Sequence, residues 1–487
     1  MVSLSHFTRS TARFLLTATV ALAVGTCPAL AQELPTTGDQ PTSPPLTDQH
    51  ISPKAADPLS DSGAIDRLTM PSTSCPEPAA DKPAQPDPVP FGGPLLERPN
   101  LTGDWFGTRT AMRDDGITWN ISSTNFYSGV ATGGLDHSFD YRGRADYLLN
   151  VDGEKAGLWK GLFIDLHGES VFGANVNHST GTLLPVSLAQ SLPTGNGSVT
   201  ALTGVKFTQA LSENFLVYAG KINTLDGFGQ PFTGGADGVN GFQNTGLLFN
   251  PVLIRTFPYS TFGAGFVVLN KDQEWVFTGA VYDTNDTPTV SGFKTFFNNG
   301  VDLFAAANLP TKFIGQPGHQ TFFATYSTGT YFNLQPSPFI DPVEGLVLPN
   351  PTKKGSWSLA YAFDQAVYVS PDDPKRSWGV FGNLGLADSN PNPFHWSANI
   401  GLGGASPFEG RKQDTFGIGY FYVGVSDSLK QLAPQLLPIR DEQGVELFYN
   451  VAATPWCHIT PDLQVVNPGR ERADTLLFLG LRTKIDF

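Results

Sequence analysis

The sequence has little cysteine, methionine or charge, and no long apolar run in its body. Three cysteines and three methionines occur among 487 residues, and 15% of the residues are charged, below the roughly one quarter usual for soluble domains. The cysteines, Cys27, Cys75 and Cys457, are too few and too scattered for a disulfide framework or a metal site. No stretch after residue 31 approaches about 18 consecutive apolar residues, so a membrane location would require a closed β-barrel.

Basic residues and enzyme motifs are scarce as well. The formal net charge is −14, and it becomes −16 if a leader containing Arg9 and Arg13 is removed. Nucleic-acid binding needs a basic face, so we expect no nucleic-acid partner. The chain lacks the G-x-S-x-G, H-E-x-x-H and P-loop patterns, and the paired carboxylates Asp372 and Asp373 stand in the turn-like "SPDDPKRS". We therefore predict that the protein is not an enzyme and needs no cofactor.

The first 96 residues divide into two segments. In residues 1–31 a basic start precedes the apolar "FLLTATVALAVGTCPAL" and the small-residue box "ALA", a pattern typical of a secretory signal peptide. An alternative makes Cys27 the lipidated residue of a lipoprotein box, although Thr26 fits poorly before it. Residues 32–96 are rich in proline and poor in aromatics, so they bury too little surface to offset the entropy of ordering. We expect a disordered tract, either a solvated linker or a segment that contacts peptidoglycan or a partner.

Residues 97–487 show short segments in which apolar and polar residues alternate, separated by turn residues. In "WSLAYAFD", Trp357, Leu359 and Tyr361 fall on one face and Ser358 and Ala360 on the other. The final "LFLGLRTKIDF" alternates in the same way. A period of two is the period of a β-strand. We expect small or polar residues on the second face throughout, as in a wall that faces water.

Two architectures share this local pattern. In a secreted β-sandwich, an enzyme or an adhesin, the apolar faces would form a core, whereas in an outer-membrane barrel they would face lipid. The segment holds about 390 residues, too many for one sandwich, and it has no obvious boundary between two. Divided among 16 strands it allows about 24 residues per strand, enough for a crossing and a turn. The sequence therefore predicts an all-β, transmembrane antiparallel β-barrel, with 16 strands.

Several segments resemble the carbohydrate-selective porins of Gram-negative bacteria, the OprB-type family. They are "LTGDWFGTRTAMRDDGITWNIS", "GLWKGLFIDLHGESVFG", "NPNPFHWSANIGLGGASPFEGRKQDTFGIGYFY" and "VELFYNVAATPWCHITPDLQVVNPG". The resemblance implies a 16-stranded barrel in the cell outer membrane that lets small saccharides diffuse passively into the periplasm. It also implies contact with outer-membrane lipid and lipopolysaccharide, and recognition of the last strand, which ends on Phe487, by the outer-membrane assembly machinery. Residues 232–265, rich in glycine and aromatics, depart from the family pattern, and a general or organic-acid porin stays open as an alternative.

A saccharide pore needs a polar constriction, and the alternation identifies candidates on the inner face. In "YRGRADYLLNVDGE" and "GLFIDLHGES" the apolar residues face outward, which leaves the charged residues inward. The predicted constriction comprises Arg142, Arg144, Asp146, Asp165, His167, Glu169, Lys221, Arg255 and Arg482. Arg255 stands in what we expect to be a loop folded into the lumen. Any of these side chains could instead be solvated or paired with a neighbour on the wall.

The "DLHGE" stretch also invites a metal interpretation. Asp165, His167 and Glu169 project from one strand face at alternate positions. The first and last of them are about 13 Å apart on a regular strand, too far to share one ion. We therefore predict no metal site.

Overall fold

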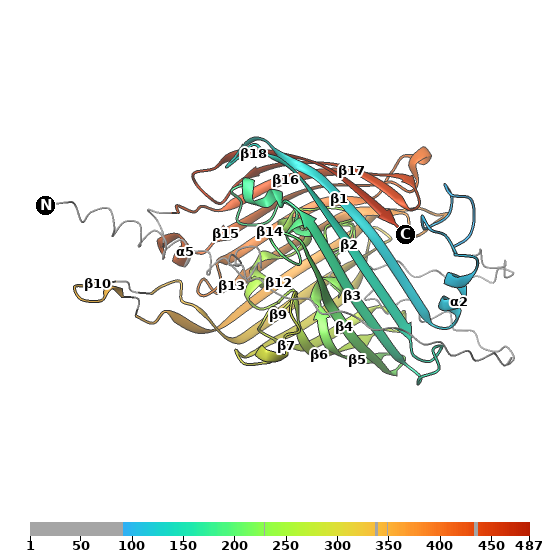
Figure 1. Ribbon diagram of the computed structural model, residues 1–487, viewed down its shortest axis with the longest axis horizontal. Coiled ribbons are helices and arrows are strands. Elements are labelled where there is room, and N and C mark those ends of the chain that lie inside the picture. The colour runs from blue at the N-terminus through green and yellow to red at the C-terminus, as the bar shows by residue number, and fades with distance from the viewer. Residues whose placement is uncertain (1–90, 228, 337–338, 348, 433–436) are drawn as a thin grey trace, which may run out of the picture.

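Sixteen strands close into one antiparallel barrel in the computed structural model, which describes residues 91–487 except 228, 337–338, 348 and 433–436 (Figure 1). The wall strands are β1 (Ile117–Gly134), β2 (Phe139–Asp152), β3 (Leu162–Gly173), β4 (Val199–Ser212), β5 (Phe215–Asn223), β6 (Ser260–Leu269), β7 (Trp275–Asp283), β8 (Val301–Phe313), β9 (Gln316–Phe332), β12 (Thr352–Val369), β13 (Ser377–Ala387), β14 (Phe394–Ala405), β15 (Thr415–Val425), β16 (Glu442–Thr454), β17 (Cys457–Asn467) and β18 (Asp474–Asp486). Neighbours along the chain pair with each other, and β1 pairs with β18 to close the ring. The predicted fold class and strand number are confirmed, and the sandwich is excluded.

The remaining elements are short. A hairpin of β10 (Phe339–Asp341) and β11 (Gly345–Val347) stands apart from the wall between β9 and β12. The helical segments are α2 (Thr108–Asp114), η2 (Val176–Ser179), α3 (Leu188–Ser191), η3 (Thr224–Gly227), α4 (Thr245–Leu248), η4 (Pro251–Arg255), η5 (Phe293–Thr295), η6 (Glu409–Arg411) and α5 (Asp427–Leu432). Within the described residues, no helix has the length and apolar character needed to cross a membrane. The predicted signal peptide, and the tract as far as residue 90, lie outside the described residues.

The outer face of the barrel is apolar and aromatic. Trp357 and Leu359 on β12 are exposed outward, whereas Ser358 between them is buried inside. On β1, Tyr127 is exposed and its neighbour Phe126 is buried in the lumen. Such a face matches the lipid-facing surface of outer-membrane barrels. The alternation predicted from the sequence therefore describes the wall correctly on its outer side.

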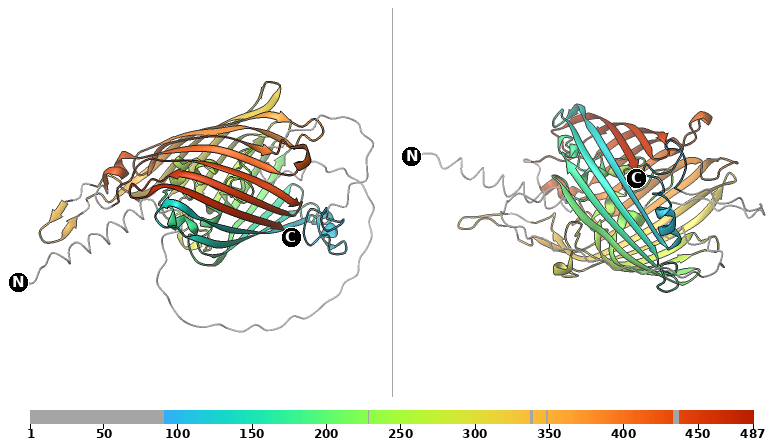
Figure 2. Two further views of the ribbon diagram at one scale, coloured as in Figure 1. Left: turned by 90° about the horizontal axis from the view of Figure 1, so that it is seen from above. Right: turned by 45° about the vertical axis from the view of Figure 1, so that its right-hand side comes forward.

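The two ends of the barrel differ in the length of their connections. Two-residue turns join β4 to β5, β8 to β9 and β16 to β17, at the end that also carries α2 and Phe487 (Figures 1 and 2). The connections 174–198, 224–259, 284–300 and 333–351 emerge at the opposite end. Outer-membrane barrels place short turns in the periplasm and long loops outside the cell. This rule assigns α2 to the periplasmic end and the β10–β11 hairpin to the extracellular end.

Residues 91–116 brace the seam between β1 and β18 at the periplasmic end. Arg109 on α2 donates from one guanidinium nitrogen to the Phe487 backbone oxygen at 2.9 Å and from the other to the Trp119 carbonyl at 3.1 Å. Its guanidinium lies 4.1 Å from the Trp119 ring centroid and 4.5 Å from that of Phe91. Leu101 N also donates to the Asp486 carbonyl at 2.8 Å. One buried arginine thus links the first strand to the last.

Replacing Arg109 by alanine should weaken the closed barrel. Hydrogen bonds from a charged group contribute about 1.5–3 kcal/mol, so the folded form should convert to the unfolded form at a lower temperature. The conversion is measured by the mobility shift of unheated and heated protein on detergent gels. Arg113→Ala on the same helix is the matched control, since Arg113 is exposed and pairs only with its neighbour Asp114. Equal conversion temperatures for the two variants would contradict this account of the seam.

Candidate functional site

Two extracellular loops, 174–198 and 224–259, fold into the lumen and fill one side of it. Their apolar side chains pack against phenylalanines that point inward from the wall. The loop members of this cluster include Leu184, Val186, Leu188, Phe242 and Leu247, and the wall members include Phe381, Phe421, Phe448 and Phe478. The expectation of a small or polar inner face throughout is therefore wrong. The reason is that the loops bring apolar surface into the lumen, and the wall must bury it.

Carboxylates of the inner wall hold both loops through backbone N–H groups. Glu446 on β16 accepts hydrogen bonds from the amides of Gln243 at 2.6 Å and Asn244 at 2.9 Å. Glu442, which precedes Glu446 on the same strand, accepts hydrogen bonds from the amides of Leu183 at 2.6 Å and Leu184 at 3.0 Å. Each glutamate thus satisfies two backbone amides that the loops bring into the lumen. Sequence reasoning missed both glutamates as site residues, although the alternation of "GVELFYNVA" already placed Glu446 on the polar face.

Arg482 on β18 also holds loop 224–259, and it does so as a hydrogen-bond donor. Its two terminal nitrogens donate to the carbonyls of Gly238 at 2.8 Å and Gly241 at 2.9 Å. The side chain points inward, as the alternation indicates, and it is buried under the loop. Its observed contacts are with the protein backbone.

Four of the predicted residues meet in one charged cluster on β2 and β3. Arg144 donates to Asp146 at 2.7 Å from its terminal nitrogen and at 2.9 Å from Nε, and it also pairs with Glu169. His167 Nε2 lies 3.5 Å from the same oxygen of Asp146. Adjacent strands supply the group, because Asp146 and Glu169 are cross-strand partners. The cluster is buried beneath loop 224–259.

Two residues of loop 224–259 complete the cluster, one near the start of the loop and one at its end. Asp226 lies 2.7 Å from Nδ1 of His167, and the Tyr259 hydroxyl donates to Glu169. Burial, with the Glu169 carboxylate as the next cause, raises the pKa of Tyr259 well above its ordinary value. The phenol therefore stays protonated and remains a donor. The sequence carried no signal for Asp226 or Tyr259, because both lie in a loop with no strand period.

Arg142 and Asp165 point inward but lie outside this cluster. Arg142 donates to the carbonyls of Gly173 at 3.0 Å and Thr194 at 2.9 Å, so it ties loop 174–198 to the wall. Asp165 forms an ion pair of 3.1 Å with Lys206 on β4. The outward direction of Val205 and Phe207 could have identified Lys206 as an inward residue.

Lys221 is a correction to the predicted set. It alternates with the inward Gly220 and Ile222, and it pairs across the sheet with Phe262 on the outer face. Its Nζ donates to the Val290 carbonyl at 2.8 Å, in loop 284–300. A buried carboxylate of that loop, Asp286, has its pKa raised to about 7 by desolvation. Lys221 therefore lies on the outer side of the wall, beneath a loop. Its position in the alternation of side chains along β5 decides the face, and its charge does not.

Arg255 lies in a loop that folds into the lumen, as expected. Its Nε donates to the Pro391 carbonyl at 3.3 Å, and its guanidinium is 5.7 Å from the Tyr331 ring centroid. Burial lowers its pKa to about 10. The contacts place Arg255 against β9 and the β13–β14 connection, away from Arg144 and its partners.

One group of three side chains has the chemistry of a metal site. Ligand atoms of Asp146, His167 and Glu169 all lie within 4.8 Å of one another. The sequence had suggested Asp165 as the third member, and the neighbouring strand supplies Asp146 in its place. The Arg144 guanidinium already donates to both carboxylates, so a metal ion would have to displace a fixed positive charge. The geometry does not favour a metal site here.

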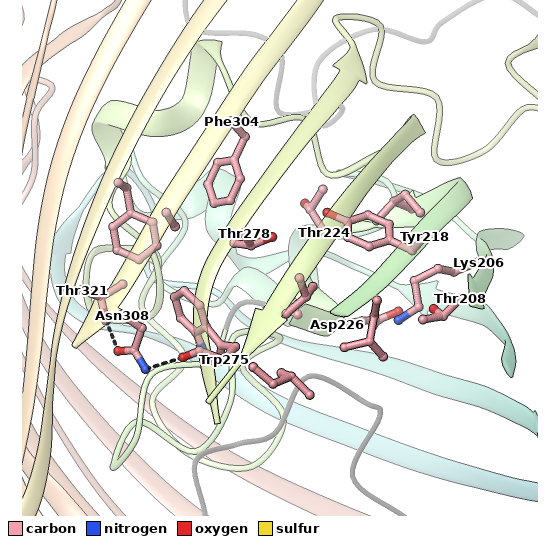
Figure 3. Close-up of a pocket in the computed structure, with 18 of the residues that line it drawn as sticks. Lys206, Thr208, Tyr218, Thr224, Asp226, Trp275, Thr278, Phe304, Asn308 and Thr321 are labelled. Carbon is pink, nitrogen blue, oxygen red and sulfur yellow. Dashed lines mark hydrogen bonds between the residues drawn. The ribbon is translucent and has the colours of Figure 1, made fainter. Parts of the chain in front are cut away.

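A cavity of about 910 Å³ lies between loop 224–259 and the wall from β3 to β9 and β12 (Figure 3). It extends toward the periplasmic turns, since its lining includes Glu154, Lys160 and Glu213. Lys206, Thr208 and Asp226 gather on one side of it in Figure 3, and Asn308 and Thr321 on the other. Thr321 Oγ1 donates to the Asn308 side-chain oxygen at 2.9 Å. The cavity thus offers hydroxyl, amide, carboxylate and ammonium groups to a solute.

Comparisons with known proteins agree with this architecture. Residues 136–487 match the family described as the carbohydrate-selective porin, OprB family. Porin B of Pseudomonas aeruginosa is 24% identical over 433 residues, which cover 80% of this chain and 91% of that protein. The high-pH structure of Pseudomonas putida OprB has a TM-score of 0.68 at 21% identity, covering 80% of this chain and 99% of that one. Its low-pH structure has a TM-score of 0.52 at 18% identity, with the same coverage. The match over most of the chain, on a closed 16-stranded barrel, shows that this protein belongs to the OprB family of carbohydrate-selective porins in the outer membrane of Gram-negative bacteria.

Proposed function

We propose that saccharides diffuse passively along the lumen of this porin and exchange hydrogen bonds with the cavity beneath loop 224–259. The observation that carries the proposal is the polar lining of that cavity. Lys206 and Asp226 supply charged groups, and Thr208, Asn308 and Thr321 supply neutral donors and acceptors. Sugar hydroxyls donate and accept, so such a mixed lining can replace their water partners one at a time.

The charge of the cavity favours neutral solutes over organic anions. Five carboxylates line it, from Glu154, Asp165, Glu213, Asp226 and Asp364. They stand against the lysine ammonium groups of Lys160 and Lys206 and the imidazole of His319, which pairs with Asp364. A pore lining of one sign repels ions of that sign. The organic-acid alternative therefore has less support from this lumen than the saccharide function.

The charged residues predicted for the constriction fall into two roles in this proposal. Arg142, Arg482 and the Arg144–Glu169 pair hold the two inward loops in place, because their donors are bonded to loop or wall groups. Asp226 and the Asp165–Lys206 pair face the cavity and meet the solute. The first set fixes the width of the passage, and the second supplies its hydrogen bonds.

The surroundings of the barrel are part of the proposal. The exposed aromatic and aliphatic side chains of the outer face would contact outer-membrane lipid and lipopolysaccharide. The final strand, which pairs with β1 as far as Asp486, would be the segment that the assembly machinery recognises. We infer a channel and no catalytic step.

Liposomes that contain the purified protein should swell faster in hexose than in amino acids of similar size that carry a net negative charge. The expected order follows from the acidic lining, which excludes anions and leaves neutral hydroxylated solutes free to pass. Light scattering after mixing with isotonic solute measures the rate. Faster swelling in an organic-acid salt than in hexose would contradict the saccharide function and favour the alternative.

Replacing Glu446 by alanine should widen the passage. The substitution removes the acceptor for the amides of Gln243 and Asn244, and a buried amide left without a partner costs about 1–3 kcal/mol, so the loop should move off the wall. Single-channel recording should show a larger and noisier conductance. Gln443→Ala is the control, because Gln443 lies on the same strand and bonds the exposed Tyr420 hydroxyl. Unchanged conductance in Glu446→Ala would mean that this loop does not limit ion flow.

Replacing Asp226 by asparagine should make the channel less selective for cations. The amide keeps a hydrogen bond to His167, and one negative charge is lost from the cavity lining. The reversal potential in a salt gradient should shift toward the equilibrium potential of the anion. Asp372→Asn, in the exposed turn between β12 and β13, is the matched control. A shift of the same size in both variants would show that the effect is not specific to the cavity.

A further inference from the structure

The cavity has a second lining surface, which is aromatic. We define this aromatic surface as Tyr218, Phe249, Phe257, Trp275, Tyr282, Phe304 and Phe323, all of which line the cavity. Wall strands β5, β7, β8 and β9 supply five of the rings, and loop 224–259 supplies the other two. Ring centroids of Phe257 and Phe304 are 5.1 Å apart, and those of Phe249 and Phe257 are 6.1 Å apart. The rings therefore form one continuous surface.

The two tyrosine hydroxyls of the aromatic surface already bond to protein atoms. The hydroxyls of Tyr218 and Tyr282 are 3.1 Å apart and bond to each other. The hydroxyl of Thr278, which also lines the cavity, donates to the Phe266 carbonyl at 2.8 Å. Against the tyrosine and phenylalanine rings, a hydroxyl-rich solute would lose hydrogen bonds to water without gaining new ones from the protein. The aromatic surface thus suits an apolar group, or the apolar face of a sugar ring, better than a set of hydroxyls.

The polar surface lies across the same cavity. Lys206 and Asp165 form an ion pair of 3.1 Å whose side chains are each about a fifth exposed, and Asp226 retains 39% exposure of its side chain. At about 910 Å³ the cavity is near the upper end of the range of sites that hold drug-sized ligands. One hexose would leave the aromatic surface largely uncovered. The whole cavity matches a larger, two-faced solute.

We propose that this cavity is a binding site for glycosides that carry an apolar aglycone, such as a phenyl or short alkyl group. The sugar hydroxyls bond to Lys206 and Asp226, and the aglycone lies against Phe323, Trp275 and Phe249. These three rings are only partly buried, so they present area to a ligand. The proposal rests on the proposed saccharide function and narrows it to a class of substrate.

The physical basis is the removal of apolar area from water. Contact of a phenyl group with several rings should tighten binding about tenfold over a methyl group on the same sugar. Aromatic pairs also add attraction beyond the buried area. The polar surface contributes equally to both ligands, so the ratio of their affinities isolates the aromatic surface.

The test measures block of single-channel ion current by phenyl β-glucoside and by methyl β-glucoside. In the unsubstituted protein the phenyl compound should block at a concentration about tenfold lower. Phe323→Ala should reduce this ratio toward one, because it weakens block by the phenyl compound more than block by the methyl compound. Phe322→Ala is the matched control, because Phe322 is the next residue of β9, is 49% exposed and faces outward. Trp275→Ala, on another strand, provides a second variant if Phe323→Ala does not fold.

The outcomes separate this proposal from the saccharide function. A ratio near one in the unsubstituted protein, with hexose still entering liposomes, would overturn the glycoside site and leave the porin function standing. An unchanged ratio in both Phe323→Ala and Trp275→Ala, each folded by its gel mobility, would also overturn it. A ratio that falls equally in Phe322→Ala would assign the effect to partition of the phenyl compound into lipid, and would reject the cavity. Failure of hexose to enter liposomes would reject the proposed function itself.

Discussion

The structure depends on the closure of its backbone hydrogen bonds around a ring. Within a bilayer no water is available to bond the edge of a sheet, so the first and last strands must pair. β1 and β18 do so from Ser122 opposite Asp486 to Gly134 opposite Asp474. Once each strand has two partners, a slip of one residue would turn every side chain to the wrong face. Closure therefore fixes which residues meet lipid and which enter the lumen.

The lumen imposes a second demand, because two loops lie inside it. Their backbone amides and carbonyls are removed from bulk water and need partners. Glu442 and Glu446 accept from the amides, and Arg142 and Arg482 donate to the carbonyls. Charged residues that would be costly to bury alone thus serve as fixed attachment points for loops. Other charged residues of the inner wall, such as Asp165 and Lys206, line the cavity.

The position of loop 224–259 decides the character of the remaining space. The loop carries Asp226 at its start and Phe249 and Phe257 further along, so it contributes to both surfaces of the cavity. The wall opposite has the same division, with Lys206 on β4 and Phe304 on β8. A polar surface and an aromatic surface therefore face one solute. This arrangement depends on how the loop folds and has no counterpart in the strand alternation.

The sequence by itself determined the closed barrel and the inner and outer faces of the segments in which apolar and polar residues alternate clearly. These follow from a period of two, which is a local property and can be seen in the sequence of a single segment. The same period correctly turned Arg144, Glu169 and Arg482 inward. Only the tertiary structure decided their partners, because Asp146 comes from a neighbouring strand and Tyr259 from a loop that has no period. It also placed Lys221 on the outer face, where its cross-strand partner is Phe262. It placed phenylalanines on the inner face, because the loops folded into the lumen bring apolar surface that the wall must bury.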